Sequence, residues 1–218
     1  MNLYFIFEGA DGCGKSTVMQ QVAEKLEERI GGARNIVTRR EPDGDYRELI
    51  MKNSTTPKKE LLLFMADRAD QNYTDYDIVL SDRSFISTLV YQVLHNNYCD
   101  VGLFYDLLKF VQIPEPANVF IIKSYKSHGD IEDRFDLMDR DEIQDIYLNL
   151  RSKFVEKCYR DKTLEPVYFN FIFDLEKKIL IYENDTSTQL PEIVDEIAEF
   201  IIDKHVGTII DDWGGINE

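Results

Sequence analysis

The sequence predicts a single α/β domain built on a mainly parallel sheet. Five short apolar runs, rich in β-branched and aromatic residues, alternate with longer stretches whose apolar residues recur at helical spacing. A glycine-rich loop, FEGADGCGKST at residues 7–17, joins the first of these runs to the first helical stretch. Alternation of this kind is typical of βαβ units, in which successive strands run parallel. With 218 residues, 44% of them hydrophobic, the chain is long enough to bury one sizeable core.

The predicted strands are short and apolar, and the predicted helices begin and end at local signals. The first helical stretch follows the glycine loop and ends at Gly31 and Gly32, because glycine is a poor helix former. Pro57 opens the second helical stretch. The predicted strands are 3–7, 35–39, 77–82, 117–123 and 179–183, and the predicted helices are 16–30, 57–73, 84–94, 141–159 and 190–203.

Two segments fit this alternation less well. Residues 167–183 contain two strand-like runs around LEKK, so a hairpin is one interpretation of them. Residues 206–218 are polar, acidic and glycine-bearing, and they form either a disordered end or a strip anchored by Trp213. We therefore predict one domain over 1–205, followed by a C-terminal tail.

The chain is strongly acidic. Asp and Glu number 41 against 25 Lys and Arg, which gives a formal charge of -16 and predicts a surface that repels nucleic acid and anionic membranes. Phosphate chemistry therefore requires a local pocket of positive charge. The three cysteines, Cys13, Cys99 and Cys158, are scattered and odd in number, which favours a reducing cytosol over a disulfide framework. We expect a cytoplasmic protein without a nucleic-acid or membrane partner.

The glycine loop predicts phosphate binding. Gly9, Gly14, Lys15 and Ser16 complete the pattern GxxxxGK[ST] between a predicted strand and a predicted helix. In such a loop backbone N–H groups converge on phosphate oxygens, the lysine bridges the outer phosphates and the serine hydroxyl can bind Mg²⁺. The alternative is a tight strand-to-helix turn that needs glycine. Cys13 is interpreted as a small filler, since no base is visible beside it. The loop alone would suit a GTPase, an ATPase or a kinase. Its expected nucleotide-binding residues, which bind ATP if the chain is a kinase, are Gly9, Gly12, Cys13, Gly14, Lys15, Ser16 and Thr17.

Three further motifs accompany the loop: TRREPDG at 38–44, LLLFMADRADQ at 61–71 and SDRSFISTLVYQ at 81–92. Together with the loop, in this order and at this spacing, they resemble the thymidylate kinase family of P-loop nucleoside monophosphate kinases. The resemblance extends from Leu3 to about Phe200 and is weaker in the second half. It implies a P-loop NTPase-type fold, in which a parallel five-stranded sheet lies between two layers of helices. It also implies a homodimer that uses ATP and Mg²⁺ to phosphorylate dTMP, in dTTP biosynthesis.

Asp82 and Arg83 follow the third predicted strand and therefore lie at the carboxyl edge of the sheet, where open α/β folds bind ligands. The guanidinium fork of Arg83 can hold a phosphate through two hydrogen bonds. Asp82, like Ser16, is a candidate Mg²⁺ ligand, acting through water. The alternative for Asp82 and Arg83 is a salt bridge that caps the following helix.

Phe64 and Arg68 lie four residues apart, so they share one helical face. Spacing alone favours a core phenylalanine and a solvated arginine, whereas the resemblance implies that the pair stacks on thymine and hydrogen-bonds its carbonyl edge. The resemblance also places Thr88 and Gln92 near the base and Tyr91 under the sugar.

The remaining substrate contacts are likewise implied by the resemblance. Asp11 matches the acid that accepts the deoxyribose 3′-hydroxyl, and Arg40 approaches the acceptor phosphate. For Ser87 and Tyr91 the alternative is that they are ordinary helix residues. The expected substrate-binding residues are Asp11, Arg40, Phe64, Arg68, Arg83, Ser87, Thr88, Tyr91 and Gln92.

The expected lid, about 124–142, departs from the family pattern because it lacks a run of closely spaced arginines. Some family members instead carry an arginine within the loop, where Gly12 stands here. Arg134 and Arg140 are therefore the candidates for the cation that neutralises the transferring group, with Lys126 behind them. Both arginines are flanked by acids, so surface ion pairs are the alternative. The expected catalytic residues are Lys15, Asp82, Arg83, Arg134 and Arg140.

Three other functions stay open on the sequence. A deoxynucleoside kinase needs a carboxylate base, for which Glu41 is the candidate, although the DR and LLLFMADR motifs fit monophosphate kinases better. The second is a kinase of the same family with a different base preference. The third is a P-loop protein that binds nucleotide without turnover. A GTPase is not favoured, because the guanine-reading NKxD motif is absent from the sequence.

Overall fold

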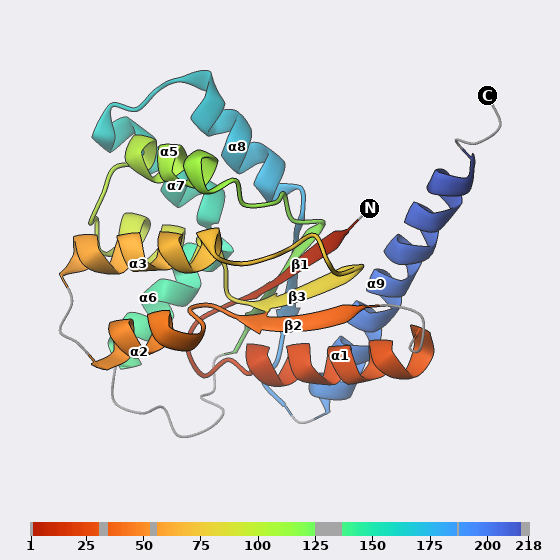
Figure 1. Ribbon diagram of the computed structural model, residues 1–218. Helices are drawn as coiled ribbons and strands as arrows, with labels where there is room; N and C mark the ends of the chain where they lie inside the picture. The colour runs from red at the N-terminus through yellow and green to blue at the C-terminus, as the bar shows by residue number, and fades with distance from the viewer. Residues whose placement is uncertain (1, 31–34, 53–55, 125–136, 187, 215–218) are drawn as a thin grey trace.

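The computed structural model describes residues 2–30, 35–52, 56–124, 137–186 and 188–214. A sheet of five parallel strands, in the order β2-β3-β1-β4-β5, lies at the centre of the molecule (Figure 1). The strands are β1 (Leu3–Glu8), β2 (Ile36–Arg40), β3 (Ile78–Asp82), β4 (Asn118–Lys123) and β5 (Ile179–Glu183). Each overlaps one of the five predicted strands. Because all strands are parallel, their carboxyl ends meet along one edge.

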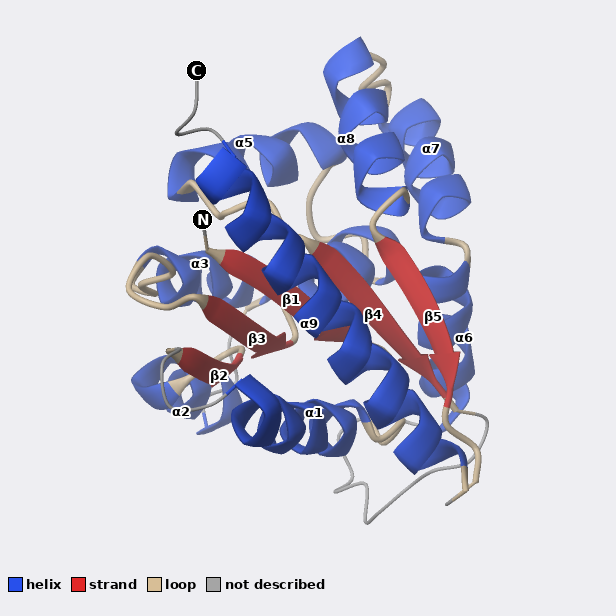
Figure 2. Ribbon diagram, turned by 90° about the vertical axis from the view of Figure 1, so that its right-hand side faces the viewer, coloured by secondary structure: helices blue, strands red, loops and turns tan. Residues whose placement is uncertain are grey.

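Helices cover both faces of the sheet and give three layers (Figure 2). One face carries α1 (Lys15–Ile30) and α9 (Gln189–Gly214), which pack against each other. The other face carries shorter helices: α3 (Pro57–Ala69), α4 (Phe85–Thr88), the π-helix η1 (Leu89–His95), α5 (Val101–Val111), α6 (Leu137–Leu148), α7 (Leu150–Asp161) and α8 (Pro166–Glu176). Helix α2 (Gly44–Lys52) contacts α3. The predicted three-layer α/β/α fold is confirmed.

Two hydrophobic cores lie on the two sides of the sheet, and β1 contributes to both. Its alternating side chains place Tyr4 and Ile6 in the core under the shorter helices, and Leu3, Phe5 and Phe7 in the core under α1 and α9. All six residues of β1 are buried, which explains the continuous apolar run in the sequence. The glycine loop therefore follows a strand that is packed on both faces.

Residues 167–176 form part of helix α8, and not the first strand of a hairpin. An uninterrupted apolar run shows no clear period, so the sequence pattern alone does not distinguish strand from helix. Packing decides the outcome, because α8 buries Ile172 and Leu175 and contacts α5 and α7. Pro166, in the first turn of α8, is the local signal that favours a helix.

Two of the predicted helical stretches are each divided into two elements, and two further helices lie where neither helix nor strand was predicted. The stretch 141–159 is divided between α6 and α7, and the stretch 84–94 begins as α4 and continues as the π-helix η1. The two further helices are α2 and α5, which like α8 were not predicted as helices. The sequence held a signal for α5, since the Asp100 carboxylate accepts a hydrogen bond from the Leu103 N–H at 2.8 Å and caps the helix.

Helix α9 passes the predicted boundary at 206 without a break. The backbone is helical as far as Gly214, so residues 206–214 continue the last helix of the domain. The anchoring role predicted for Trp213, like residues 215–218, lies outside the described part of the chain. None of the described helices, α9 included, combines the length and the apolar character needed to cross a membrane.

Replacing Gly207 tests this helical continuation. A Cβ at Gly207 would meet no other atom within 4 Å, so alanine fits there without strain. We expect Gly207→Ala to raise the free energy of unfolding by about 0.5–1 kcal/mol, because glycine inside a helix is destabilising relative to alanine. Urea unfolding followed by circular dichroism measures this change. An unchanged midpoint would contradict a folded helix at this position.

Candidate active site

The glycine loop connects β1 to α1 at the carboxyl edge of the sheet (Figure 1). Glycine is required at Gly9, where φ is +145° and a Cβ would lie 2.3 Å from the carbonyl oxygen of Ile122. Gly12 and Gly14 also have positive φ angles, of 72° and 87°. The loop therefore turns tightly into the N-terminus of α1, a geometry that favours anions.

Lys15 and Cys13 occupy different environments in this loop. The Lys15 side chain is 7% exposed, and its Nζ lies 3.9 Å from Asp11 Oδ1, within the loop. Cys13 is fully buried beside Gly9, and its carbonyl oxygen accepts a hydrogen bond from Asn184 Nδ2 at 3.1 Å. The burial of Cys13 agrees with a filling role, whereas Lys15 stands where its charge faces the loop.

Ser16 and Asp82 meet, as expected of a pair that holds a divalent cation. Ser16 Oγ donates a hydrogen bond of 2.5 Å to Asp82 Oδ2. The other carboxylate oxygen, Oδ1, is buried and has no hydrogen-bond partner among the described residues. A hydroxyl and a carboxylate with a free oxygen are the donors that Mg²⁺ prefers, so these two residues fit that ion.

Arg83 is held at the edge of the sheet by backbone and side-chain contacts. Its φ is +77°, and its N–H donates to the carbonyl oxygen of Phe7 at 3.0 Å. Its Nη2 donates to the Asp11 carboxylate, and its Nη1 donates to Ser87 Oγ at 3.0 Å. The guanidinium carbon lies 5.2 Å from the centre of the Tyr91 ring. Four residues that we expected to bind substrate therefore form one cluster.

The charges of this cluster stabilise one another. Burial alone would raise the pKa of Asp11, but the neighbouring Arg83 and Lys15 outweigh it and lower that pKa. The alternative of a helix-capping salt bridge does not describe the geometry, since Ser84 caps α4 through its Oγ, which accepts from the Ile86 N–H at 3.0 Å.

Arg68 is a buried residue, and not the solvated charge that spacing alone favoured. Its Nε donates to Glu41 Oε2 at 2.6 Å. Its Nη2 donates to the carbonyl oxygen of Ser84 at 2.8 Å and to Thr88 Oγ1 at 2.9 Å. Burial raises the pKa of Glu41 to about 7, although Arg68 counteracts part of that rise. Glu41 is thus committed to positioning Arg68.

The third nitrogen of Arg68 is the one that remains for a ligand. Among the described residues, Nη1 contacts only the sulfur of Met65, at 3.9 Å. The guanidinium carbon lies 5.8 Å from the centre of the Phe64 ring, so the aromatic plane and the guanidinium stand side by side as the four-residue spacing predicts.

Glu8, at the end of β1, belongs to the site although the sequence did not single it out. Its carboxylate is fully buried, and it accepts hydrogen bonds from Ser84 Oγ (2.7 Å), the Ser87 N–H (3.1 Å), Ser87 Oγ (2.6 Å) and the Tyr147 hydroxyl (2.8 Å). Ser87 in turn accepts a hydrogen bond from Arg83, so Glu8 positions that arginine indirectly, through Ser87. The available signal was an acid that ends an otherwise apolar strand.

Arg140 lies beside the loop, where it donates to two backbone carbonyl groups. It belongs to α6, and its Nε and Nη2 donate to the carbonyl oxygens of Asp11 (3.1 Å) and Ser124 (2.7 Å). The other lid candidates, Arg134 and Lys126, lie outside the described residues.

The remaining predicted residues are dispersed around the loop and the η1 helix. Thr17 is exposed on α1, and Gln92 is buried in η1. Arg40 ends β2 with a largely exposed side chain, and its Nε lies 4.0 Å from Asp82 Oδ2.

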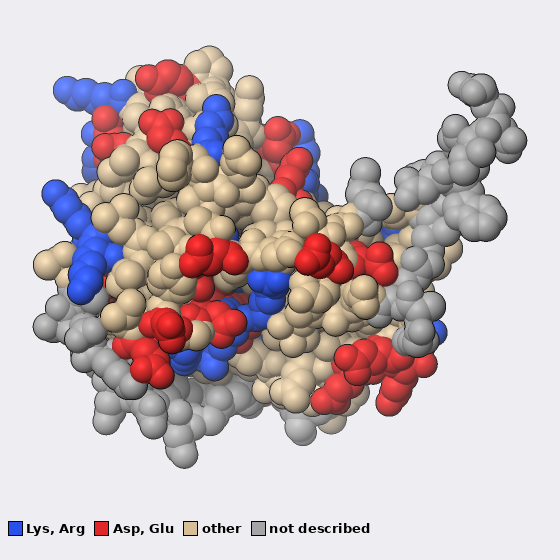
Figure 3. All heavy atoms as spheres, viewed as in Figure 1, with Lys and Arg blue, Asp and Glu red and all other residues tan. Residues whose placement is uncertain are grey.

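Arg47, on α2, is a second residue that the sequence did not single out. Burial, followed by the proximity of Arg40, lowers the pKa of Arg47. Arg83 lowers that pKa further, and Asp82 counteracts part of the change. Arg40, Arg47 and Arg83 therefore bring positive charge to the same edge. Figure 3 shows basic side chains over the carboxyl end of β2, with acidic groups on either side. This is the local positive region that the acidic composition required.

Comparisons with known proteins agree with this geometry. The family model described as thymidylate kinase matches residues 7–158. A thymidylate kinase of Campylobacter fetus is 29% identical over 212 residues, which cover 89% of this chain and 98% of that protein. A probable thymidylate kinase of Methanococcus maripaludis is 27% identical and covers 94% of this chain and 97% of that protein. The crystal structure of a thymidylate kinase from Ehrlichia chaffeensis shares the fold, with a TM-score of 0.63 over 92% of this chain and 98% of that chain, at 24% identity.

A parallel sheet with a glycine loop after its central strand and arginines at its carboxyl edge, in a chain that matches the thymidylate kinase model, defines a P-loop phosphotransferase of the nucleoside monophosphate kinase type. The matched region, residues 7–158, contains the loop and all three accompanying motifs. The chain belongs to the thymidylate kinase family.

Gly9 and Gly44 offer a matched test of the loop geometry. Gly9→Ala should lower the free energy of unfolding by about 3 kcal/mol or more, because the Cβ collides with backbone and the φ is strained. Gly44, with φ +45° and no atom within 4 Å of its Cβ position, is the control, and its alanine variant should lose about 1 kcal/mol. Urea titration of both variants measures the difference. Equal losses would contradict the close approach of Gly9 to Ile122.

Proposed function

We propose that the chain transfers the γ-phosphoryl group of ATP to dTMP, giving dTDP and ADP, as a step of dTTP biosynthesis. The observation that carries the proposal is that a site for a triphosphate and a site for a nucleobase both lie at the carboxyl edge of the sheet. The Lys15 and Ser16–Asp82 group suits a triphosphate, and the buried Arg68 beside Phe64 and Thr88 suits a nucleobase. Arg83 and Asp11 lie at the same edge, where an acceptor phosphate and sugar would sit.

On the donor side, the N–H groups of residues Gly9 to Thr17 surround the ATP phosphates and Lys15 meets charge on the outer phosphates. Ser16 and Asp82 hold Mg²⁺, which when bound neutralises phosphate charge. The buried, unpartnered Oδ1 of Asp82 supports this assignment. Cys13 keeps the loop filled from behind.

On the acceptor side, Arg83 holds the dTMP phosphate and Arg40 approaches it from β2. Asp11 accepts the 3′-hydroxyl, and Tyr91 lies under the sugar, where its ring crowds a 2′-hydroxyl. The acceptor phosphate is already ionised near neutral pH, so no general base is needed. The reaction is accelerated by the alignment of the two phosphates and by neutralisation of the charge on the transferring group.

The base lies on Phe64, with its O4 edge toward Arg68 Nη1. The contacts of Arg68 Nε and Nη2 hold the guanidinium in place and leave Nη1 to donate. Thr88 supports this arginine, and Gln92 lines the same region from η1.

The further cation over the transferring group is assigned to the lid, 124–142, with Arg134 and Arg140 as its sources. Arg140 already donates to the loop carbonyl of Asp11, which keeps its charge within reach of the phosphates. Closure of the lid would expel water and complete the site.

A deoxynucleoside kinase would require Glu41 as a base. The Glu41 carboxylate is 2% exposed and accepts the Arg68 Nε hydrogen bond, so it lacks the access to a 5′-hydroxyl that this reaction needs.

The protein is proposed to work in the cytoplasm as a homodimer. The cysteines Cys13, Cys99 and Cys158 are all free, as a reducing compartment requires. An apolar stripe on α5, comprising Leu103 (49% exposed), Leu107 and Phe110 (84% exposed), is the surface proposed to join two copies.

A panel of acceptors tests the proposed activity. With ATP and Mg²⁺, we expect ADP release with dTMP and none with thymidine, because the latter needs a base. Lys15→Ala should lower turnover by about 10²–10³-fold, as for loss of one transition-state donor. Glu41→Gln should leave the thymidine result unchanged. Phosphorylation of thymidine that Glu41→Gln abolishes would favour the deoxynucleoside kinase instead.

Base discrimination tests the role of Arg68. Removing Arg68 alone would leave Glu41 buried without its partner, so the wild type is compared with the double variant Glu41→Gln/Arg68→Met, which removes both charges of the pair. In the wild type, kcat/KM for dTMP should exceed that for dCMP by more than about tenfold, since an unpaired buried donor costs about 1–3 kcal/mol. In the double variant this ratio should collapse toward one.

Phe64→Ala is the matched control, because stacking reads a π-face that both pyrimidines share. It should weaken both reactions alike. A dTMP to dCMP ratio that survives in the double variant Glu41→Gln/Arg68→Met would show that another residue reads the base.

Sedimentation velocity tests the proposed dimer. We expect a particle of twice the 25.5 kDa chain mass. Phe110→Asp should shift it to the monomer, because a carboxylate in an apolar interface is strongly disfavoured. Tyr159→Asp, on an exposed residue of α7, is the control and should not change the mass. A monomeric wild type would remove the proposal.

A further inference from the structure

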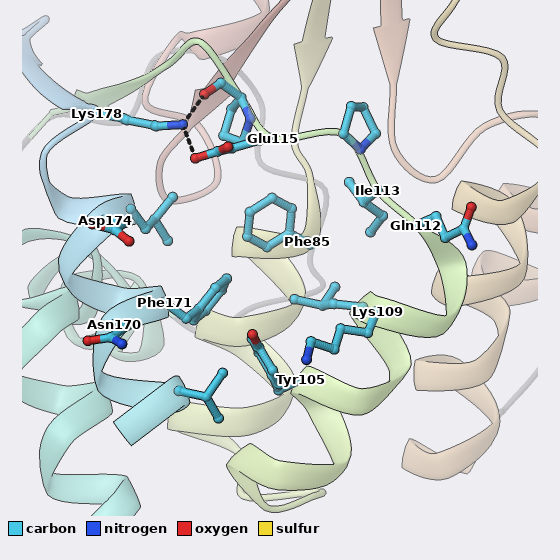
Figure 4. Close-up of a pocket in the computed structure, with 15 residues that line it drawn as sticks. Phe85, Tyr105, Lys109, Gln112, Ile113, Glu115, Asn170, Phe171, Asp174 and Lys178 are labelled. Carbon is cyan, nitrogen blue, oxygen red and sulfur yellow. Dashed lines mark hydrogen bonds and ion pairs between the residues drawn. The ribbon is translucent and has the colours of Figure 1, made fainter. Parts of the chain in front are cut away.

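A second hollow lies between α5 and α8, away from the glycine loop (Figure 4). Its volume is about 360 Å³, within the range of small-molecule sites. The segment 112–116, which leads into β4, and Lys178, which precedes β5, line one side. The pocket is therefore near the amino ends of these strands, whereas the glycine loop follows the carboxyl end of β1. None of the residues assigned to phosphoryl transfer lines it.

The floor and walls of this pocket are apolar and largely aromatic. Phe85 and Leu108 are buried beneath it. Phe171, from α8, lies with its ring centre 6.2 Å from that of Phe85 and 5.5 Å from that of Tyr105. In Figure 4 the Phe85 and Phe171 rings border the same space. Because these rings are tilted against one another, they present both faces and edges to the pocket, which suits a planar aromatic ligand.

The pocket lining contains two lysines and two acids, and both acids are paired with lysines. Lys178 Nζ donates to Glu115 Oε1 at 2.5 Å, and Asp174 is paired with Lys177 at 2.8 Å. Both acids of the lining are thus neutralised. Among the described residues, no carboxylate lies within ion-pair distance of Lys109. Lys109 is therefore the lysine of the lining without an ion pair among the described residues, in a protein whose formal charge is -16.

Lys109 stands beside the aromatic wall. Its Nζ lies 4.9 Å from the centre of the Tyr105 ring, one helical turn before it on α5. Figure 4 shows the Lys109 ammonium and the Tyr105 hydroxyl on the same side of the pocket. A cation and a hydroxyl side by side at the rim of an apolar hollow form a recognition pair for a carboxylate or a sulfonate.

We propose that this pocket binds a small planar aromatic anion. The ring system lies against Phe85 and Phe171, and the anionic group meets Lys109 and the Tyr105 hydroxyl. The proposed dimer stripe does not compete for this site, because Leu103 and Phe110 lie on the opposite face of α5 from Tyr105 and Lys109.

Three consecutive residues connect the pocket to the candidate active site at the carboxyl edge of the sheet. Phe85 forms its floor, Ser84 donates to the buried Glu8 and accepts from Arg68, and Arg83 pairs with Asp11. A ligand that shifts Phe85 therefore acts on a backbone segment that carries the phosphate-binding arginine. Occupancy should change turnover without competing with either substrate.

The probe is 8-anilinonaphthalene-1-sulfonate, an aromatic monoanion whose fluorescence rises in apolar sites. Its uncharged counterpart, N-phenyl-1-naphthylamine, has the same rings and no sulfonate. Both are titrated into the full chain with ADP and dTMP at saturating concentration, so that the nucleotide sites are filled. We expect saturable binding of both probes. In a separate assay with ATP and dTMP at saturating concentration, we expect a lower kcat in the presence of the sulfonate.

Three variants of exposed residues give the decisive comparison. Lys109→Met should weaken sulfonate binding by roughly three- to fivefold, as for loss of one exposed ion pair, and leave the uncharged probe unaffected. Lys204→Met is the matched control, because Lys204 likewise lies over a ring, that of Phe200 at 5.7 Å, on the distant helix α9. Val167→Trp should fill the pocket and abolish binding of both probes.

The outcomes separate cleanly. Equal sulfonate affinity in the wild type, Lys109→Met and Val167→Trp would overturn the site. Displacement of the sulfonate by nucleotide would place it in the active site and also overturn the proposal. An unchanged kcat at saturating probe would overturn the link through Phe85.

Discussion

Glu8 places a carboxyl group where none of its surface is exposed to solvent, and the site at the carboxyl edge of the sheet is arranged around keeping that group hydrogen-bonded. A buried ion without partners costs several kcal/mol, and each hydrogen bond to a charged group returns about 1.5–3 kcal/mol. The donors come from α4, through Ser84 and Ser87, and from α6, through Tyr147. The strand before the glycine loop is thereby tied to the helix after Arg83. Moving any one of these elements would leave Glu8 unsatisfied.

The same logic explains how an acidic chain maintains a site for anionic phosphates. Arg83 faces Asp11, and Arg68 faces Glu41. Each carboxylate holds its arginine in one position and offsets the mutual repulsion of positive charges before a ligand arrives, so little reorganisation is needed on binding. The lowered pKa of Asp11 shows that this field favours its charged form. Salt screens charges beyond about 8 Å, so the distant acidic surface has little influence on the site.

Residues 83–85 connect the charged site at the carboxyl edge of the sheet to the apolar pocket between α5 and α8. One backbone segment presents Arg83 to the loop, Ser84 to Glu8 and Phe85 to the opposite side of the helical layer. The left-handed φ of Arg83 permits this change of direction within a single residue. Close-packed side chains have low compressibility and transmit strain. A displacement of the hydrophobic floor under α5 and α8 is therefore passed on to the charged edge of the sheet.

The sequence by itself determined the five strands, the phosphate loop and the family, because strand burial and glycine geometry are written in neighbouring residues. Local patterns also placed Phe64 and Arg68 on one helical face. Only the tertiary structure decided what these side chains touch. The partner of Arg68 is Glu41, 27 residues away, and Glu8 meets Tyr147, 139 residues away. Such partners satisfy buried charges, and burial is a property of the packed layers that no short window of sequence contains. Residues 167–173 illustrate the same limit, since an apolar run becomes strand or helix according to what it packs against.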